Sequence, residues 1–357
     1  MAPSASFSDC ECKGRVFFLI CKLFQRKILF FYYLCRCYYK IPLFIMLNWI
    51  LLIVGFTMIT VGATWLTNGS AAVAQRLKIS EFIIGMTIVA VGTSLPELTV
   101  SVASTFAGSA DMAIGNVVGS NIFNILFILG ICALIRPVSF TRNNLRVDIW
   151  LCLAVSIGLV VMLLWGGKLS RLEGIMMLLC YVVIILISIK LGKSEQEASV
   201  DTEHDAENFS WFKSLIWIAL GLVGLVFGAD LTVDSATTIA REFGISERVI
   251  GITLLAGGTS LPELAASIAS VSKGHGALAL GNVIGSCIAN ILLILGACAT
   301  ITPLAMGGIT VIDLIALIVA VILLTISARM FGYRVITRME ALVFLAAYIG
   351  YIFYLIH

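Results

Sequence analysis

The sequence predicts an all-α integral membrane protein whose ten transmembrane helices form two inverted five-helix repeats. Of the 357 residues, 60% are hydrophobic and 12% are charged, whereas about a quarter of the residues of a soluble domain are charged. Continuous apolar runs such as residues 309–328 match the roughly 20 residues of a membrane-spanning helix and not the alternating pattern of a membrane β-barrel. A long segment also occurs twice in the chain.

The composition excludes two classes of protein. A net charge of +3 leaves no extended basic surface, which a nucleic-acid-binding domain needs, so nucleic acid is not an expected partner. The hydrophobic content is far above that of a disordered chain. The lipid bilayer is therefore the expected surrounding of this protein.

Apolar runs separated by polar residues predict the ten spans in order. They lie at residues 47–67, 81–105, 112–135, 147–166, 172–191, 214–234, 247–272, 277–301, 309–328 and 338–356. These spans divide the chain into a first repeat at 46–191, a linker at 192–213 and a second repeat at 214–357. The stretch Gly192–Ser210 carries six acidic residues, which is typical of a solvated flexible linker; a cation-binding regulatory loop is the alternative.

Residues 1–45 fit the membrane pattern poorly. The run Val16–Ile45 is apolar but is interrupted by five basic residues, and a charge near the middle of a span costs several kcal/mol. It also lacks the compact apolar region and small-residue cleavage site of a signal peptide. We expect the functional protein to start near Met46, with the first 45 residues dispensable or belonging to a misassigned start.

The distribution of basic residues predicts the orientation in the membrane. After Met46, the loops that follow odd-numbered spans carry 12 Lys and Arg residues, and the loops on the opposite side carry 4. Because cytoplasmic loops are enriched in Lys and Arg, the first set is expected to be cytoplasmic. Both termini are then external, and the acidic linker is cytoplasmic.

The internal repeat is the dominant feature of the sequence. SEFIIGMTIVAVGTSLPELTVSVAS from Ser80 recurs as SERVIGITLLAGGTSLPELAASIAS from Ser246, and GNVVGSNIFNILFILG from Gly115 recurs as GNVIGSCIANILLILG from Gly281, both at an offset of 166 residues. Roughly 34 of about 58 aligned positions are identical. Each repeat holds five spans, and an odd number inverts the second copy in the membrane, as in secondary transporters.

Each copy of the motif GTSLPE places a helix breaker and a carboxylate inside a span. Pro96 and Pro262 lack an N–H and should free backbone carbonyls in the membrane. Glu97 and Glu263 follow them, at a depth where an unpaired charge costs about 3 kcal/mol or more. The hydroxyls of the preceding Thr-Ser pairs should share a helix face with these glutamates.

The next span of each half adds further oxygen atoms. Its Ser and Asn side chains lie four residues apart and so share one face, and neighbouring glycines allow close helix approach. The side chains that could converge are Thr93, Ser94, Glu97, Ser120, Asn124, Thr259, Ser260, Glu263, Ser286 and Asn290. Oxygen ligands select Ca²⁺, Na⁺ or Mg²⁺, and a dehydrated cage suits Ca²⁺ better than Mg²⁺. Two glutamates would neutralise one Ca²⁺, and Na⁺ could replace it, which predicts ion exchange.

The two GTSLPE motifs, the paired GN-x-x-GS-x-x-x-N segments and the acidic linker resemble the repeats of the sodium/calcium exchanger superfamily. The similarity covers Met46–His357 and is greatest to bacterial inner-membrane calcium/sodium antiporters. The resemblance implies ten helices, a bacterial inner (plasma) membrane location, and alternating access through sliding of the first and sixth helices. It implies no cofactor and no enzymatic activity, because Ca²⁺ and Na⁺ are the transported ions.

The resemblance also assigns an ion site. It implies the ten side chains given above together with backbone oxygens near Ala90 and Ala256, with Glu97 and Glu263 as the Ca²⁺ ligands and the carbonyls and hydroxyls holding Na⁺. Many members of this superfamily carry an Asp at the position of Asn290. The departure leaves open the number of carboxylates, the stoichiometry and coupling to K⁺ or H⁺.

Several alternative interpretations remain open. The two glutamates could form a structural pair, and the four asparagines Asn116, Asn124, Asn282 and Asn290 could link helices, an interpretation that we favour for Asn116 and Asn282. Asp230 and Asp234 could line an external entry or, as we favour, lie at the membrane surface beside Arg241 and Arg248. We expect His275 to be solvated, and the five cysteines after Met46 to be buried.

Other functions are also compatible with oxygen ligands. A Ca²⁺/H⁺ antiporter is the nearest alternative, because glutamates in a low dielectric can titrate near neutral pH. A cation channel is less favoured, since channels usually surround an axis with rings of ligands. A membrane-embedded metal-dependent enzyme would need a separate nucleophile or base.

Overall fold

The computed structural model describes residues 15–141, 147–196, 210–245, 250, 256–307, 309–329 and 335–356. The chain divides into two compact units, Met1–Ile50 and Leu51–His357. Of the first unit the structure describes a helical stretch, the beginning of α1 (Arg15–Leu77). All contacts discussed below lie within the second unit.

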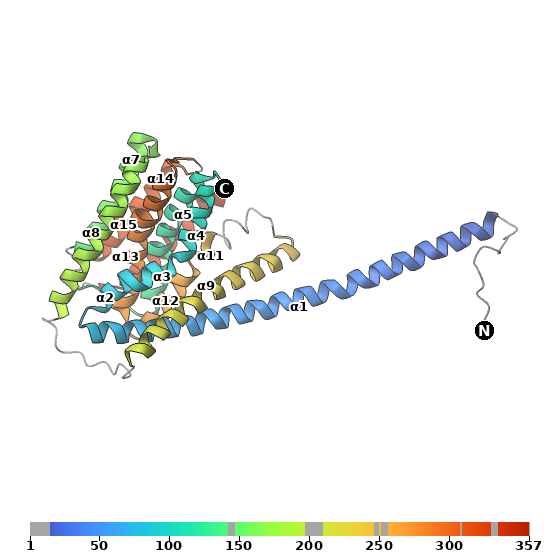
Figure 1. Cartoon of the computed structure of the whole chain (residues 1–357), viewed down its shortest axis with the longest axis horizontal. Coiled ribbons are helices and arrows are strands. Elements are labelled where there is room, and N and C mark those ends of the chain that lie inside the picture. The colour runs from blue at the N-terminus through green and yellow to red at the C-terminus, as the bar shows by residue number, and fades with distance from the viewer. Residues whose placement is uncertain are drawn as a thin grey trace. The chain divides into compact units, whose positions relative to one another are not determined.

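The first half of the second unit is almost entirely helical (Figure 1). After α1 come α2 (Glu81–Ile84), η1 (Gly85–Val89), α3 (Ala90–Thr93), α4 (Leu95–Phe106), α5 (Ala110–Ile122), η2 (Phe123–Ile128), α6 (Leu129–Ile135), β1 (Val138–Ser139), α7 (Ile149–Gly166), β2 (Lys168–Leu169) and α8 (Arg171–Gln196). The labels η1 and η2 mark π-helical turns.

The second half has a similar order of elements. They are α9 (Trp211–Glu242), α11 (Ala256–Gly258), α12 (Leu261–Ser272), α13 (Gly276–Ala289), the π-helical η5 (Asn290–Leu295), α14 (Gly296–Ile301), β3 (Leu304–Ala305), α15 (Val311–Ser327), β4 (Val335–Ile336) and α16 (Arg338–Ile356).

Within the described residues, seven helices are long and apolar enough to cross a membrane, and the bent pair Glu81–Thr93 and Leu95–Phe106 would make an eighth span. These eight coincide with eight of the predicted spans, and the shorter apolar helix α15 coincides with a ninth. The remaining prediction, 247–272, lies partly outside the described residues. The helical membrane class is therefore confirmed.

Three helices continue beyond the predicted spans. The spans predicted to end at residues 67, 191 and 234 belong to helices that end at Leu77, Gln196 and Glu242. The extension of α1 contains no proline and several alanines, which favour a helix in water as well as in lipid. Hydropathy marks the membrane segment, whereas the helix ends only where its backbone pattern is broken.

Proline ends two helices at corresponding places. Pro137 follows α6 and Pro303 follows α14, and the preceding residues Arg136 and Thr302 are extended, with φ/ψ of −148°/130° and −144°/134°. A proline disfavours helical geometry in the residue before it. After each proline the backbone forms a short strand, β1 or β3, which the sequence analysis did not predict.

The strands pair across the two halves. β1 pairs antiparallel with β4, with Val138 opposite Ile336, and β2 pairs antiparallel with β3, with Lys168 opposite Ala305. Each two-stranded sheet therefore takes one strand from each half of the chain.

The helix that contains the second GN-x-x-GS segment forms the core. Of the apolar window of Gly276–Ile301, 94% lies inside the protein, compared with 22% for Arg171–Lys190 of α8. Cys180 on α8 is exposed, whereas Cys132, Cys152, Cys287 and Cys298 are buried. The prediction that all five are buried is wrong for Cys180, because hydropathy cannot distinguish a lipid-facing surface from a protein core.

Glycines bring α9 into close contact with the part of α1 that belongs to the second unit, where the two helices meet in Figure 1. A Cβ on Gly62 would lie 2.8 Å from the carbonyl oxygen of Gly221, and a Cβ on Gly221 would lie 2.6 Å from the backbone nitrogen of Leu66. Gly55 and Gly228 meet in the same way. Since the obstructing atoms are backbone, a larger side chain cannot be accommodated by a rotamer change.

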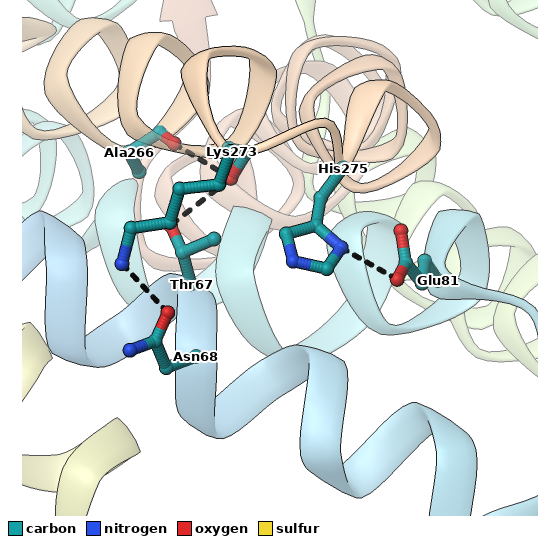
Figure 2. Close-up of polar contacts among 7 residues, drawn as sticks. Thr67, Asn68, Glu81, Ala266, Lys273 and His275 are labelled. Carbon is teal, nitrogen blue, oxygen red and sulfur yellow. Dashed lines mark hydrogen bonds and ion pairs between the residues drawn. The ribbon is translucent and has the colours of Figure 1, made fainter. Parts of the chain in front are cut away.

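At one end of the bundle, the turn between α12 and α13 contacts α1 and α2 (Figure 2). Lys273 Nζ donates to Asn68 Oδ1 at 2.6 Å, and the hydroxyls of Thr67 and Ser270 lie 3.1 Å apart. His275 Nδ1 lies 2.7 Å from Glu81 Oε1. The expectation that His275 is solvated is therefore wrong, because its ring is partly buried against a carboxylate of the other half.

We predict that Gly221→Ala destabilises the protein although alanine is the better helix former. The added methyl group meets backbone atoms of α1, and overpacking of this kind costs about 1–3 kcal/mol. Thermal unfolding of the purified protein in detergent would show a lower Tm. Gly350→Ala is the matched control because a Cβ there meets no atom within 4 Å; equal Tm values for the two variants would contradict the close packing.

Candidate functional site

The predicted helix breaks lie at the two GTSLPE motifs. α3 ends at Thr93 and α4 begins at Leu95, with a bend of 46° between the two helical segments. In the second half, α11 ends at Gly258 and α12 begins at Leu261. Pro96 and Pro262 lie in the first turn of α4 and α12, where a missing N–H is tolerated.

The break places each glutamate in the first turn of a new helix. Glu97 lies in the first turn of α4, Glu263 lies in the first turn of α12, and both side chains are fully buried. The positive end of a helix dipole stabilises a carboxylate at this position. Each half therefore supplies one buried carboxylate beside a helix N-terminus.

Hydrogen bonds to the two carboxylates cross between the halves. Ser94 Oγ donates to Glu263 Oε1 at 2.7 Å, and Ser260 Oγ donates to Glu97 Oε1 at 2.9 Å. The two serines and two glutamates thus form a reciprocal pair of contacts. Neither half can complete the surroundings of its own glutamate alone.

A continuous helix from Thr93 to Glu97, and from Thr259 to Glu263, would place each Thr-Ser pair on the face of its own glutamate. The serine hydroxyls instead bond to the glutamates of the opposite half. Because the helix is interrupted at Ser94 and at Ser260, each serine points to the opposite half.

The predicted serines of the GN-x-x-GS segments join the same network. Ser94 Oγ lies 3.2 Å from Ser286 Oγ, and Ser260 Oγ lies 3.2 Å from Ser120 Oγ. Both contacts again link a broken helix of one half to the unbroken helix of the other. The structure therefore brings together Ser94, Glu263 and Ser286, and likewise Ser260, Glu97 and Ser120.

Asn116 and Asn282 donate hydrogen bonds to the broken helices α4 and α12. Asn116 Nδ2 donates to Glu97 O at 3.4 Å and to Ser101 Oγ at 3.0 Å, and Asn282 Nδ2 donates to Glu263 O at 3.3 Å and to Ser267 Oγ at 2.9 Å. Thr93 Oγ1 donates to Asn282 Oδ1 at 3.2 Å. The favoured interpretation of both asparagines as helix links agrees with these contacts.

Several oxygen atoms of the predicted site have no hydrogen-bond partner although they are buried. They are Glu97 Oε2, Glu263 Oε2, Asn124 Oδ1, Asn290 Oδ1 and Thr259 Oγ1. A buried polar atom without a partner costs about 1–3 kcal/mol, and more when it is charged. Five such atoms from one predicted site indicate a place that a cation would complete.

Asn124 and Asn290 lie on locally widened helices. η2 begins one residue before Asn124, and η5 begins at Asn290. Single π-helical turns occur frequently at functional sites because they leave backbone and side-chain groups outside the regular hydrogen-bond ladder. The sequence analysis did not predict these turns.

Ala90 and Ala256 are the two predicted backbone ligands, and the structure describes the surroundings of Ala90 more fully. Ala90 O accepts from the backbone N–H of Ser94 at 3.0 Å and from Thr93 Oγ1 at 3.3 Å. Ala256 begins α11, and residues 251–255 before it lie outside the described residues. A carbonyl oxygen has two lone pairs, so Ala90 O can keep one of these bonds and still contact an ion.

Asn121 is a residue that the sequence analysis missed. Its side chain is fully buried, Nδ2 donates to Cys287 O at 3.1 Å, and Oδ1 accepts from Asn290 Nδ2 at 3.0 Å. The repeat places Cys287 at the position of Asn121, and this mismatch was the available signal.

The acidic pair on α9 lies apart from this network. Asp230 and Asp234 are exposed, and Arg248 lies outside the described residues, so their pairing at the membrane surface stays a prediction. The acidic linker is described only at its two ends, in α8 and from Ser210 onward.

The profile of the family described as "Sodium/calcium exchanger protein" matches residues 47–190 and 213–357. The chain is 40% identical over 259 residues to the inner membrane protein YrbG of Escherichia coli (strain K12), covering 71% of this chain and 79% of that protein. It is 30% identical over 344 residues to the sodium/calcium exchanger MaX1 of Methanosarcina acetivorans, covering 86% of this chain and 98% of that protein.

A solved structure is also similar over most of the chain. The sodium-calcium exchanger NCX_Mj, soaked with 2.5 mM Na⁺ and 0.1 mM Ca²⁺, matches with a TM-score of 0.75 and 32% sequence identity. The match covers 86% of this chain and 97% of that chain.

We predict that Asn282→Ala lowers stability more than Asn116→Ala. Asn282 is buried and makes three side-chain hydrogen bonds, whereas Asn116 is only partly buried and makes two. Leaving buried partners unpaired costs about 1–3 kcal/mol. Chemical or thermal unfolding in detergent measures both losses, and an equal or larger loss for Asn116→Ala would contradict the support that we assign to Asn282.

Proposed function

The chain belongs to the sodium/calcium exchanger protein family, and we propose that this multi-pass membrane protein exchanges Ca²⁺ for Na⁺ at a central two-glutamate site. The resemblance indicated by the GTSLPE motifs agrees with the family profile, which covers both halves. The relatives named above are membrane proteins or exchangers.

The observation that carries the proposal is the set of buried oxygen atoms without partners. Two belong to carboxylates, two to amides and one to a hydroxyl. Hard oxygen ligands of mixed charge suit Ca²⁺ and Na⁺, and a dehydrated cage is easier for Ca²⁺ than for Mg²⁺. Two carboxylates balance the charge of one Ca²⁺, so an ion resolves both the unpaired atoms and the buried charge.

We propose that the ion site consists of the residues that the sequence analysis singled out. They are Glu97, Glu263, Thr93, Ser94, Thr259, Ser260, Ser120, Asn124, Ser286 and Asn290, with the carbonyls of Ala90 and Ala256, and with Pro96 and Pro262 as the helix breakers. Glu97 and Glu263 are the Ca²⁺ ligands, and the hydroxyls and carbonyls are available to Na⁺.

The crossed serine contacts suit exchange better than passive flow. Each carboxylate is held by a serine of the opposite half, so a movement of one half relative to the other changes both carboxylates together. An ion bound between them would be enclosed by groups from both halves. A channel would instead need a continuous row of ligands along an open axis.

We further propose that the chain has ten spans in two inverted repeats, at 46–191 and 214–357, joined by the linker at 192–213. The sheets β1–β4 and β2–β3, which each pair one half with the other, support this arrangement. The close contact of α1 and α9 supports their movement as a pair during alternating access. Residues 1–45 are proposed to be dispensable for exchange.

We propose a bacterial inner-membrane location with both termini external and the 192–213 linker cytoplasmic. The excess of Lys and Arg in the loops that follow odd-numbered spans supports this orientation. In this orientation, Lys273 and His275 join the two halves at the cytoplasmic end (Figure 2).

We predict that Na⁺-loaded proteoliposomes containing the protein take up Ca²⁺, and that Glu97→Gln and Glu263→Gln each abolish this uptake. The amide removes the negative charge but keeps the shape of the side chain. Glu242→Gln on the exposed end of α9 is the matched control and should transport normally. Uptake driven only by a pH gradient would favour a Ca²⁺/H⁺ antiporter, and uptake without either gradient would favour a cation channel.

We predict that Ser94→Ala and Ser260→Ala raise the Ca²⁺ concentration for half-maximal uptake by about tenfold or more. Each loses a hydrogen bond to a carboxylate, and such bonds contribute about 1.5–3 kcal/mol. Ser156→Ala is the control, because the Ser156 hydroxyl bonds to Cys152 O within its own helix. Unchanged Ca²⁺ dependence in both variants would exclude a role for the crossed contacts in ion binding.

A further inference from the structure

We propose that Asn121 is a positioning residue that turns the amide oxygen of Asn290 toward the ion, and that Asn124 in the other half has no such partner. The two amide ligands are therefore unequal although the two repeats are nearly identical. This inference rests on the proposed function, because it describes how the same site is prepared for its ion.

The direction of the Asn290 amide follows from a chain of hydrogen bonds. The backbone oxygen of Cys287 can only accept, so the Asn121 atom 3.1 Å away must be the donor Nδ2. Asn121 Oδ1 then faces Asn290 at 3.0 Å, and the Asn290 atom that meets it must be Nδ2. Asn290 Oδ1 is left as the free atom.

Burial makes this orientation costly to change. Asn121 and Asn290 are both fully buried. Turning the Asn290 amide over would bring two oxygen atoms together at Asn121 and would leave the buried Nδ2 without an acceptor. Asn121 thus holds one end of the amide, and the unpaired Oδ1 is presented to a cation.

The other half lacks this device because of a single difference between the repeats. The counterpart of Asn121 at an offset of 166 residues is Cys287. The Cys287 thiol is a weak donor without an amide acceptor, and its Sγ lies 3.9 Å from Asn121 O. The side chain of Asn124, the counterpart of Asn290, has no nitrogen or oxygen partner and contacts only the sulfur of Cys287, which is a weak acceptor.

The consequence is a site with one firmly held and one weakly held amide. Asn290 is held by the Asn121 amide before the ion arrives, whereas Asn124 is held only by a weak sulfur contact, so its amide turns over more easily. A preorganised ligand binds more tightly because less ordering is needed on binding. Loss of Asn121 should therefore weaken cation binding without removing any ligand atom.

The experiment measures Ca²⁺ affinity of the full chain in lipid nanodiscs by calorimetry, with a thermal unfolding curve for every variant. Asn121→Ala should raise the Kd for Ca²⁺ by about tenfold, the equivalent of one hydrogen bond of ordinary strength. Cys287→Asn replaces the weak sulfur partner of Asn124 by an amide and should lower the Kd.

The background Asn290→Asp separates positioning from general damage to the fold. A carboxylate presents oxygen at both ends and needs no orientation, so Asn121→Ala in this background should change the Kd by less than about twofold. Such a double-mutant cycle isolates the coupling between the two positions.

Equal increases of the Kd in both backgrounds, or an unchanged Kd for Asn121→Ala in the wild-type background, would overturn the inference while leaving the exchange function intact. Absence of Ca²⁺ binding by the wild-type protein would instead contradict the proposed function itself. The two failures are thus distinguishable.

Discussion

The structure depends on one constraint, which is the burial of two carboxylates in a membrane-embedded core. Glu97 and Glu263 are fully buried, and a serine of the opposite half donates a hydrogen bond to each. The helix breaks at Ser94 and Ser260 lie at the serines that form these crossed hydrogen bonds. A site with one oxygen of each carboxylate paired and the other free is suited to hold a cation and to release it.

The surrounding helices are organised to keep these interruptions stable. Asn116 and Asn282 donate to the backbone carbonyls of Glu97 and Glu263, one residue after each proline. The glycines of α1 and α9 allow two long helices to approach at backbone distance. The asparagines thus hold the helices that carry the two glutamates. The helices α1 and α9, which move in the proposed exchange cycle, pack tightly against each other.

Small departures from the repeat create differences between the halves. Cys287 occupies the position in the second repeat that corresponds to Asn121, so Asn124 lacks the amide partner that Asn290 has. Lys273 and His275 tie one end of the bundle together, and their counterparts Ala107 and Ser109 cannot form the same contacts. Duplication therefore supplies the architecture, and single substitutions give each half its own role.

The membrane class, the position of most spans, the internal repeat and the two GTSLPE breaks can be predicted from the sequence, because hydropathy and repetition are properties of contiguous residues. The bond of Ser94 to Glu263, the bond of Asn290 to Asn121 and the outward position of Cys180 cannot, because they depend on how the helices pack. These contacts join residues from opposite halves or distinguish a lipid-facing surface from a core. The local sequence pattern is the same for a lipid-facing surface as for a core, and it carries no information on contacts between the halves. These features therefore follow from the packing of the two halves.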